Sequence, residues 1–201
     1  METKKQSGFA LLMTLIVVGV VLSIGLSVLD LSIKQIRLST NTKDSEIAFH
    51  AANAGMECAR FWHRTLGTEM ENGELLTDVE CFGADATEMN PLHTGLDPGE
   101  VEAEEIENTS DGVAYQYQYK VSWPTNDRCT IVNTLVANVF AFQNNLTITG
   151  MDSLFPGYPG GATKICEEGE RCATIAVRGY NKPCNQVPSY GTVEREVLLE
   201  L

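Results

Sequence analysis

The chain carries an uncharged apolar stretch that is long enough to cross a lipid bilayer. It covers residues 9–29 and would reach about 30 Å as an α-helix, at about 1.5 Å per residue. Only eight residues precede it, and two of them, Lys4 and Lys5, are basic. Because lysines that flank a first apolar segment favour the cytoplasmic side of a membrane, we expect the rest of the chain to be translocated.

Three interpretations of this stretch are open. A secretory signal peptide has a shorter apolar run, about 7 to 15 residues, followed by a small-residue cleavage site, so it fits poorly. A plain signal anchor fits the hydropathy well. The third interpretation comes from the junction itself, Lys4-Lys5-Gln6-Ser7-Gly8-Phe9. This junction resembles the leader of type IV pilins and type II secretion pseudopilins.

The resemblance implies a processing step. In that family a prepilin peptidase cuts after the glycine, here Gly8, and the new N-terminal residue, here Phe9, is methylated. Residues 1–8 would then form a leader, and residues 9–29 would lie in the membrane before they pack against the same helix of neighbouring subunits. Gly19 and Gly25 would allow a close approach of helices in either place.

One position departs from the family pattern. Most members carry Glu as the fifth residue of the mature chain, where it pairs with the N-terminus of a neighbouring subunit, and this chain has Met13 there. A charge inside the bilayer is costly and is usually kept for a function. Its absence indicates a minor or tip subunit rather than the major repeating one.

The helical pattern continues beyond residue 29. Apolar residues recur at spacings of three, four or seven as far as Phe61, and charged residues occupy the other positions. The first proline in the chain is Pro91. We therefore predict one helix from about Phe9 to about Thr65, with an amphipathic second half over residues 30–66.

Small residues are unusually frequent in residues 48–62. Small side chains let another element approach closely, which suits a helix that lies on a sheet. The stretch also resembles an aromatic-x-x-Ala-x-Ala-Gly-x-Glu pattern found in minor pilins of the PilX type. The residues that match this pattern, and that the resemblance implies in helix–sheet packing, are Phe49, Ala52, Ala54, Gly55 and Glu57.

Residues 67–112 are strongly acidic. No Lys or Arg occurs between Arg64 and Lys120, whereas fourteen acidic residues do. Prolines and glycines interrupt the segment, so we predict a loop-rich, solvated surface. Asp97 and Glu100 are weak candidates for a calcium site because calcium is held by several oxygen ligands, although their spacing matches no EF-hand loop. The net charge of −13 argues against nucleic-acid binding, which normally uses a basic patch.

Residues 113–201 change to the period of β-strands. Alternation over residues 113–123 predicts a half-buried strand. Further strands are predicted at 130–142, 145–149, 172–180 and 192–201, with a loop at 155–161. Consecutive strands without intervening helices favour an antiparallel sheet. We therefore expect an α+β fold in which a long N-terminal helix packs on an antiparallel sheet, as in pilin-like proteins.

Six cysteines lie in the expected outward part of the chain. An even number in a translocated, loop-rich domain indicates disulfides, each of which stabilises a small fold by about 2 to 4 kcal/mol. A zinc site is disfavoured because no Cys-x-x-Cys pair occurs. Of the fifteen possible connectivities, we expect Cys58 with Cys81, Cys129 with Cys184, and Cys166 with Cys172.

No familiar catalytic motif occurs in the sequence, neither Gly-x-Ser-x-Gly nor a phosphate-binding glycine loop nor His-Glu-x-x-His. We therefore expect a non-enzymatic structural subunit of a type IV pilus-like filament that needs no cofactor. It would lie in the inner or cytoplasmic membrane and later at the cell surface, with prepilin peptidase and other pilin subunits as partners. Two alternatives stay open: a type II secretion pseudopilin, and an uncleaved single-span protein whose outer domain binds a ligand or partner.

Overall fold

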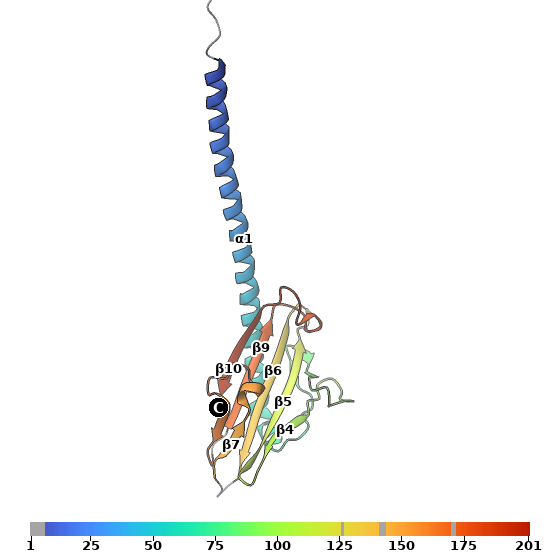
Figure 1. The fold of residues 1–201 in the computed structure, drawn as a ribbon. Coiled ribbons are helices and arrows are strands. Elements are labelled where there is room, and N and C mark those ends of the chain that lie inside the picture. The colour runs from blue at the N-terminus through green and yellow to red at the C-terminus, as the bar shows by residue number, and fades with distance from the viewer. Residues whose placement is uncertain (1–6, 126, 141–143, 170–171) are drawn as a thin grey trace, which may run out of the picture. The chain divides into compact units, whose positions relative to one another are not determined.

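The computed structural model describes residues 7–125, 127–140, 144–169 and 172–201 (Figure 1). The chain divides into two compact units, residues 1–43 and residues 44–201, and we call the second unit the β-domain. Helix α1, Ser7–Thr65, contributes to both units. The single long helix and the antiparallel sheet predicted from the sequence are therefore confirmed, and the fold is α+β. Residues 1–6 of the expected leader, with both lysines, lie outside the described part of the chain.

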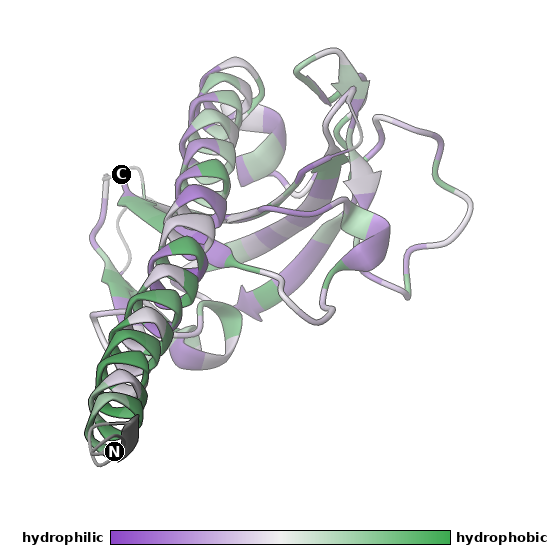
Figure 2. Cartoon of the chain, turned by 90° about the horizontal axis from the view of Figure 1, so that it is seen from above, coloured by the Kyte–Doolittle hydropathy of each residue, from purple (hydrophilic) through white to green (hydrophobic). Residues whose placement is uncertain are grey.

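The first half of α1 presents its side chains to the surroundings. Residues 9–43 are exposed without exception. Figure 2 shows that apolar residues dominate this half of the helix, whereas polar and apolar residues alternate further along it.

The β-domain is built on a six-stranded antiparallel sheet. Its four longest strands are adjacent in the order β10-β9-β6-β5. Their bounds are β5 Gly112–Ser122, β6 Cys129–Val139, β9 Cys172–Tyr180 and β10 Glu194–Glu200. Strand β9 has the predicted bounds. The strand predicted at residues 130–142 ends at Val139 in the structure, and residues 141–143 lie outside the described part.

One face of the sheet packs against the second half of α1 and against the short helix α2, Gly67–Glu71. The contact is apolar, and burying each large apolar side chain contributes about 1.5 to 3 kcal/mol relative to leaving it exposed. The residues that meet in this core include Met56, Ala59, Met70, Tyr117, Tyr119, Val132, Ile175 and Val177.

The opposite face of the sheet is covered over part of its area by a smaller unit. This unit consists of β7, Leu146–Thr149, β8, Thr163–Cys166, and the helical turn α3, Met151–Leu154. Its apolar residues Leu146, Ile148, Met151 and Phe155 bury Ala114 and Leu135 of the main sheet. The sequence predicts β7, but neither β8 nor α3.

The prediction of a half-buried strand at residues 113–123 is therefore wrong for part of its length. Ala114 and Gln116, on the face expected to meet solvent, are both buried. Gln116 Nε2 donates a hydrogen bond of 2.7 Å to Asn133 Oδ1 of the neighbouring strand, which satisfies the buried amide. Alternation within one strand cannot reveal that a segment about thirty residues further along folds back over it.

Residues 67–112 contain more regular structure than the loop-rich segment predicted. After α2 the chain forms a hairpin, β1 Glu80–Cys81 with β2 Ala84–Asp85, and then the short strand β3, Thr87–Glu88. The largest departure is β4, Ala103–Asn108, which pairs with β5 although three of its six residues are glutamates. A charged strand is tolerated at this position because β4 has β5 as its partner in the main sheet and its charges discourage pairing with other chains.

Three disulfides join the expected pairs. Cys58–Cys81 links α1 to β1, and Cys166–Cys172 links β8 to β9. Cys129–Cys184 links β6 to the single turn η1, Cys184–Gln186. Because the bonds use all six cysteines of the sequence, no thiol is left to ligate a metal.

Candidate functional site

The apolar first half of α1 is the largest candidate surface for a function. Within the described residues α1 is the one helix that is long and apolar enough to cross a membrane. Its bulky side chains are widely exposed, for example Phe9 and Leu15 at 68% and Leu26 at 67%. A continuous apolar surface of this length needs a lipid or protein cover, because water solvates it poorly.

The expected processing and assembly residues all lie on this part of α1. Gly8 and Phe9 are its second and third residues, and Met13 is 48% exposed. A Cβ atom placed on Gly19 or Gly25 would meet no atom within 4 Å. The packing of the chain itself therefore does not require glycine at these two positions, and the free space is available to a neighbouring helix.

Hydroxyl groups on this half of the helix bond back to their own backbone. Thr14 Oγ1 donates to the carbonyl of Leu11 at 2.9 Å, and Ser27 Oγ donates to the carbonyl of Ser23 at 2.9 Å. A serine or threonine bonded in this way does not need water. These two residues can thus face lipid or another helix without an unsatisfied donor.

The second half of α1 lies unusually close to the sheet. A Cβ on Gly179 of β9 would be 2.2 Å from the carbonyl oxygen of Ala48 and 2.2 Å from the nitrogen of Ala52. From the neighbouring strand β6, Thr130 Oγ1 donates a hydrogen bond of 3.1 Å to the carbonyl of Ala51 on the helix. The small-residue stretch of α1 therefore brings helix and strand backbones into direct contact, as the sequence predicts.

The PilX-type pattern marks this contact only in part. Ala52 and Gly55 are buried against the sheet, and Ala54 is half-buried. Phe49, at 49% exposure, and Glu57, also exposed, do not pack on the sheet, so the expectation for these two residues is wrong. At about 100° per residue, Glu57 points about 140° away from Ala52, whereas Phe49 lies about 60° from it, at the edge of the buried face.

Gly179 carries a signal in the sequence that is absent from the predictions above. It is an isolated glycine inside a predicted strand, and such a glycine often marks a close approach of another backbone. Its strand partner Thr130, which bonds the helix carbonyl, carries no such signal.

The calcium candidates do not form a metal site. Glu100 Oε2 accepts the backbone N–H of Asp97 at 2.9 Å, so the two residues close a turn with each other. In residues 7–125, 127–140, 144–169 and 172–201, no three His, Cys, Asp or Glu side chains group closely enough to hold a metal ion. The structure therefore gives no support to Asp97 and Glu100 as weak candidates for a calcium site.

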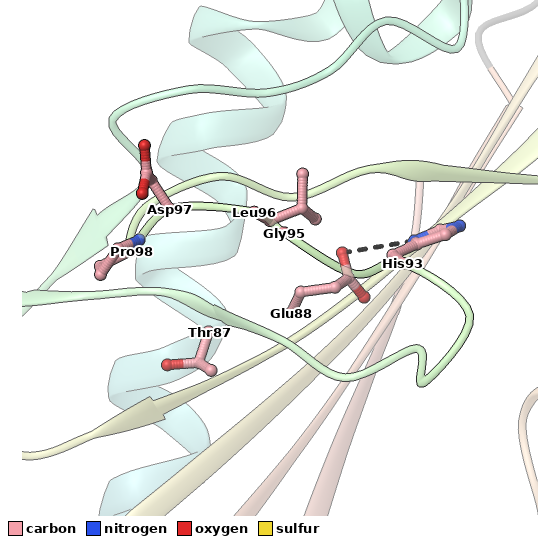
Figure 3. A pocket seen from close by; sticks show the side chains of 7 residues that line it. All are labelled: Thr87, Glu88, His93, Gly95, Leu96, Asp97 and Pro98. Atoms are coloured by element: carbon pink, nitrogen blue, oxygen red, sulfur yellow. Dashed lines mark ion pairs between the residues drawn. The ribbon is translucent and has the colours of Figure 1, made fainter.

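A small cavity of about 240 Å³ lies beside the loop that connects β3 to β4 (Figure 3). Its lining includes Glu88, His93 and Asp97. Figure 3 shows the His93 ring turned toward the Glu88 carboxylate, with 3.7 Å between Nδ1 and Oε2. Neither Glu88 nor His93 is marked by any motif in the sequence, so this pair was not among the predicted site residues.

The edge strand β10 and its neighbour β9 carry a network of charged and polar side chains. Burial raises the pKa of Glu196, and the nearby Arg178 guanidinium, whose Nε lies 3.1 Å from Glu196 Oε2, opposes this effect. Burial, followed by the Glu194 carboxylate, raises the pKa of Tyr180 to about 12. The hydrogen bond from Tyr158 lowers the pKa of Glu200. These interactions fasten β10 to its neighbours and bring together no recognisable catalytic pair.

Another local feature is the hairpin turn at Phe82 and Gly83, both of which have positive φ, 60° and 75°. This geometry suits a two-residue hairpin, in which Asn or Gly is usual at the first position. Phe82 stacks on Trp123, with 4.3 Å between the ring centroids, and Arg128 lies 5.2 Å from the centroid of the same Trp123 ring. The stacking offsets the backbone strain and fixes the β1–β2 hairpin to the sheet.

Comparisons with known proteins add no relative. No family model matches the chain, and neither a curated protein nor a solved structure is significantly similar to it.

Proposed function

We propose that this chain is a non-enzymatic structural subunit of a type IV pilus-like filament. One observation carries the proposal: a continuous helix has a fully exposed first part, residues 9–43, which begins with the uncharged apolar stretch 9–29, and a second part that is built into a disulfide-bonded β-domain. A helix of this kind can anchor the domain in a membrane and can equally pack against helices of other subunits.

The physical advantage lies in the similarity of the two environments. Lipid tails and the side chains of packed helices are both apolar, so moving the first half of α1 from membrane to filament changes little in its burial. The inward hydrogen bonds of Thr14 and Ser27 serve in both places. The free space at Gly19 and Gly25 lets a neighbouring helix come close.

The disulfides support an outward position for the β-domain. Such bonds form and persist outside the reducing cytosol. Together with the lysines that precede the apolar run, they support a position of residues 44–201 beyond the inner or cytoplasmic membrane, and at the cell surface after assembly.

Within the filament we assign the chain to the minor or tip subunits. Met13 stands where most pilins carry Glu, so the chain offers no carboxylate to the N-terminus of a neighbour. Its partners would be other pilin subunits, with prepilin peptidase acting before assembly. Purified filaments should therefore contain this chain as a small fraction of their mass, and filaments made mostly of it would contradict the assignment.

The processing step gives the sharpest test. The full chain is incubated in detergent with prepilin peptidase and then weighed by mass spectrometry. We expect loss of residues 1–8 and, when the methyl donor is present, a methyl group on Phe9. Gly8→Ala should abolish the cleavage, and Gly19→Ala is the matched control because its added methyl group meets open space.

The outcomes separate the classes of function. A wild-type chain that stays full-length would contradict the proposal and favour an uncleaved membrane anchor with an outward binding domain. A Gly8→Ala chain that is still processed would show that the junction is not a prepilin site. To distinguish a pilus from a secretion pseudopilus, the gene is deleted, and surface filaments and protein secretion are compared.

A further inference from the structure

One buried carboxylate closes the loop between β3 and β4, residues 89–102. The Glu88 side chain is 7% exposed, and its oxygens accept three backbone N–H groups. Oε1 accepts those of Met89 and Asn90 at 2.8 Å each, and Oε2 accepts that of Glu102 at 3.0 Å. Because Glu102 lies fourteen residues further along the chain, the carboxylate holds the two ends of the loop together.

His93 faces this carboxylate from within the loop (Figure 3). Its side chain is 15% exposed, and Nδ1 lies 3.7 Å from Glu88 Oε2. That distance is too long for a hydrogen bond, and among the residues that the structure describes, Nδ1 has no hydrogen-bond partner. A protonated ring, by contrast, would form an ion pair with the carboxylate at this distance.

The charged groups around the pair are mainly acidic. Asp97 lines the same cavity, Glu100 accepts the N–H of Asp97, and Glu104 accepts the side-chain amide of Asn90. On the adjacent strand β5, Tyr119 lies opposite Glu88, and Lys120 lies opposite the preceding Thr87. From residue 65 to residue 119 the sequence has no Lys or Arg, so His93 is the one side chain of this segment that can become positive.

We propose that Glu88 and His93 form a pH-sensitive latch on the β3–β4 loop. Imidazoles change charge between about pH 5 and pH 8, a range in which ordinary carboxyls stay ionised. When the His93 ring is protonated, its attraction to Glu88 tightens the loop. When the ring is neutral, this attraction is absent and the loop loosens. The latch thereby controls the cavity wall and the position of Leu92, a loop residue that is 82% exposed.

The latch is independent of the proposed filament role, because it depends only on contacts between Glu88 and the β3–β4 loop. It is tested by hydrogen–deuterium exchange of the full chain in detergent at about pH 5.5 and about pH 8. After correction for the intrinsic pH dependence of exchange, the amides of Met89, Asn90 and Glu102 should exchange about threefold more slowly at the lower pH. Equal corrected rates at both pH values would overturn the proposal.

Variants assign the effect to the pair. His93→Gln should abolish the pH difference, and a difference that survives this change would also overturn the proposal. His50→Gln is the matched control, because His50 lies at the same 3.7 Å from a glutamate, Glu46, but on an exposed helix surface. It should leave the loop unchanged.

Glu88→Gln removes the other half of the latch and should speed exchange of the loop at both pH values. Unchanged loop exchange in this variant would count against the proposal. Protection of β5 and β6 in the same experiment reports whether the variant is still folded, and if it is not, His93→Gln decides the question alone.

Discussion

At the scale of single residues, Gly179 sets the distance between α1 and the sheet. A side chain at this position would collide with backbone atoms of Ala48 and Ala52, which cannot rotate away as a flexible side chain can. The helix would have to shift outward, and its own residues Met56 and Ala59 would lose contacts with the sheet in the core. The closeness of helix and strand therefore depends on glycine from the strand as much as on alanine from the helix.

We predict that Gly179→Ala destabilises the β-domain by about 3 kcal/mol, the range of an overpacked core. The measurement is urea unfolding followed by tryptophan fluorescence. Gly67→Ala is the control, since a Cβ on Gly67 meets nothing within 4 Å, and it should change the unfolding free energy little. Equal unfolding midpoints for the two variants would show that the helix can move away from the sheet without a loss of unfolding free energy.

Buried tyrosines make the stability of the β-domain fall at alkaline pH. Burial and the neighbouring Glu194 raise the pKa of Tyr180 from 10.0 to about 12, and burial also raises the pKa values of Tyr117 and Tyr119. The folded protein thus keeps a proton that the unfolded chain releases. Stability is complete below about pH 10 and falls as the pH rises from there toward the folded value.

We expect ionisation of Tyr180 to reduce the unfolding free energy between about pH 10 and pH 12, by less than the roughly 1.4 kcal/mol per pH unit that a group without solvent screening would cost. Tyr180→Phe should make the slope shallower in urea titrations at stepped pH. Tyr190→Phe, at a fully exposed site, should not change it. A slope that Tyr180→Phe leaves intact would assign the alkaline loss to other groups.

At the scale of residues, the sequence patterns predicted which kinds of contact form better than they predicted which residues make them. The small-residue stretch indicated a close helix–sheet contact, which Ala52 and Gly55 make. The same pattern placed Phe49 and Glu57 in that contact, and both are exposed. A linear motif does not say which of its residues face the partner. Glu88 and His93 could not be predicted at all, because their contact depends on the path of an irregular loop.

At the scale of elements, each disulfide connects two elements that do not pair with each other as neighbouring strands: α1 with β1, β6 with η1, and β8 with β9. The bonds span 55, 23 and 6 residues for Cys129–Cys184, Cys58–Cys81 and Cys166–Cys172. In the chain-entropy picture, a disulfide that closes a longer loop removes more freedom from the unfolded chain.

Replacing each pair by alanines should therefore reduce stability in that order, by about 4, 3 and 2 kcal/mol. Urea unfolding of the three double variants gives the values. The largest loss from the Cys166–Cys172 pair, instead of the smallest, would show that local packing outweighs chain entropy.

The elements themselves differ in how far the sequence predicts them. Periodicity identified α1 and β9, because both are long and regular. Periodicity missed β4, because its glutamates are typical of a solvated loop. The pairing of β4 with β5 depends on a partner strand that alternation within β4 does not reveal. Periodicity also missed β8 and α3, which are short and are stabilised by packing on the face of the sheet that they cover.

At the scale of the whole molecule, residues 44–201 have their own core, and residues 9–43 bury no side chain within the chain. The first segment thus adds nothing to the stability of the second. It instead adds a large apolar surface that must be covered from outside.

A fragment of residues 44–201 should accordingly fold without detergent, remain monomeric, and unfold at the same midpoint as the full chain. Size-exclusion chromatography and thermal unfolding by circular dichroism test this. A fragment that aggregates or melts at a clearly lower temperature would mean that the first half of α1 stabilises the domain.

The contacts of α1 also determine when the β-domain can fold during synthesis. Ala51 accepts its hydrogen bond from Thr130, 79 residues later, and Ser45 accepts bonds from Arg195, 150 residues later. At about 5 to 20 residues per second, a ribosome needs about 10 to 30 seconds to supply the last of these partners. During that interval the small-residue face of the helix has no sheet to lie on. The nascent chain therefore completes its fold only after most of it has been made, and it depends on its surroundings to keep the helix from associating too early.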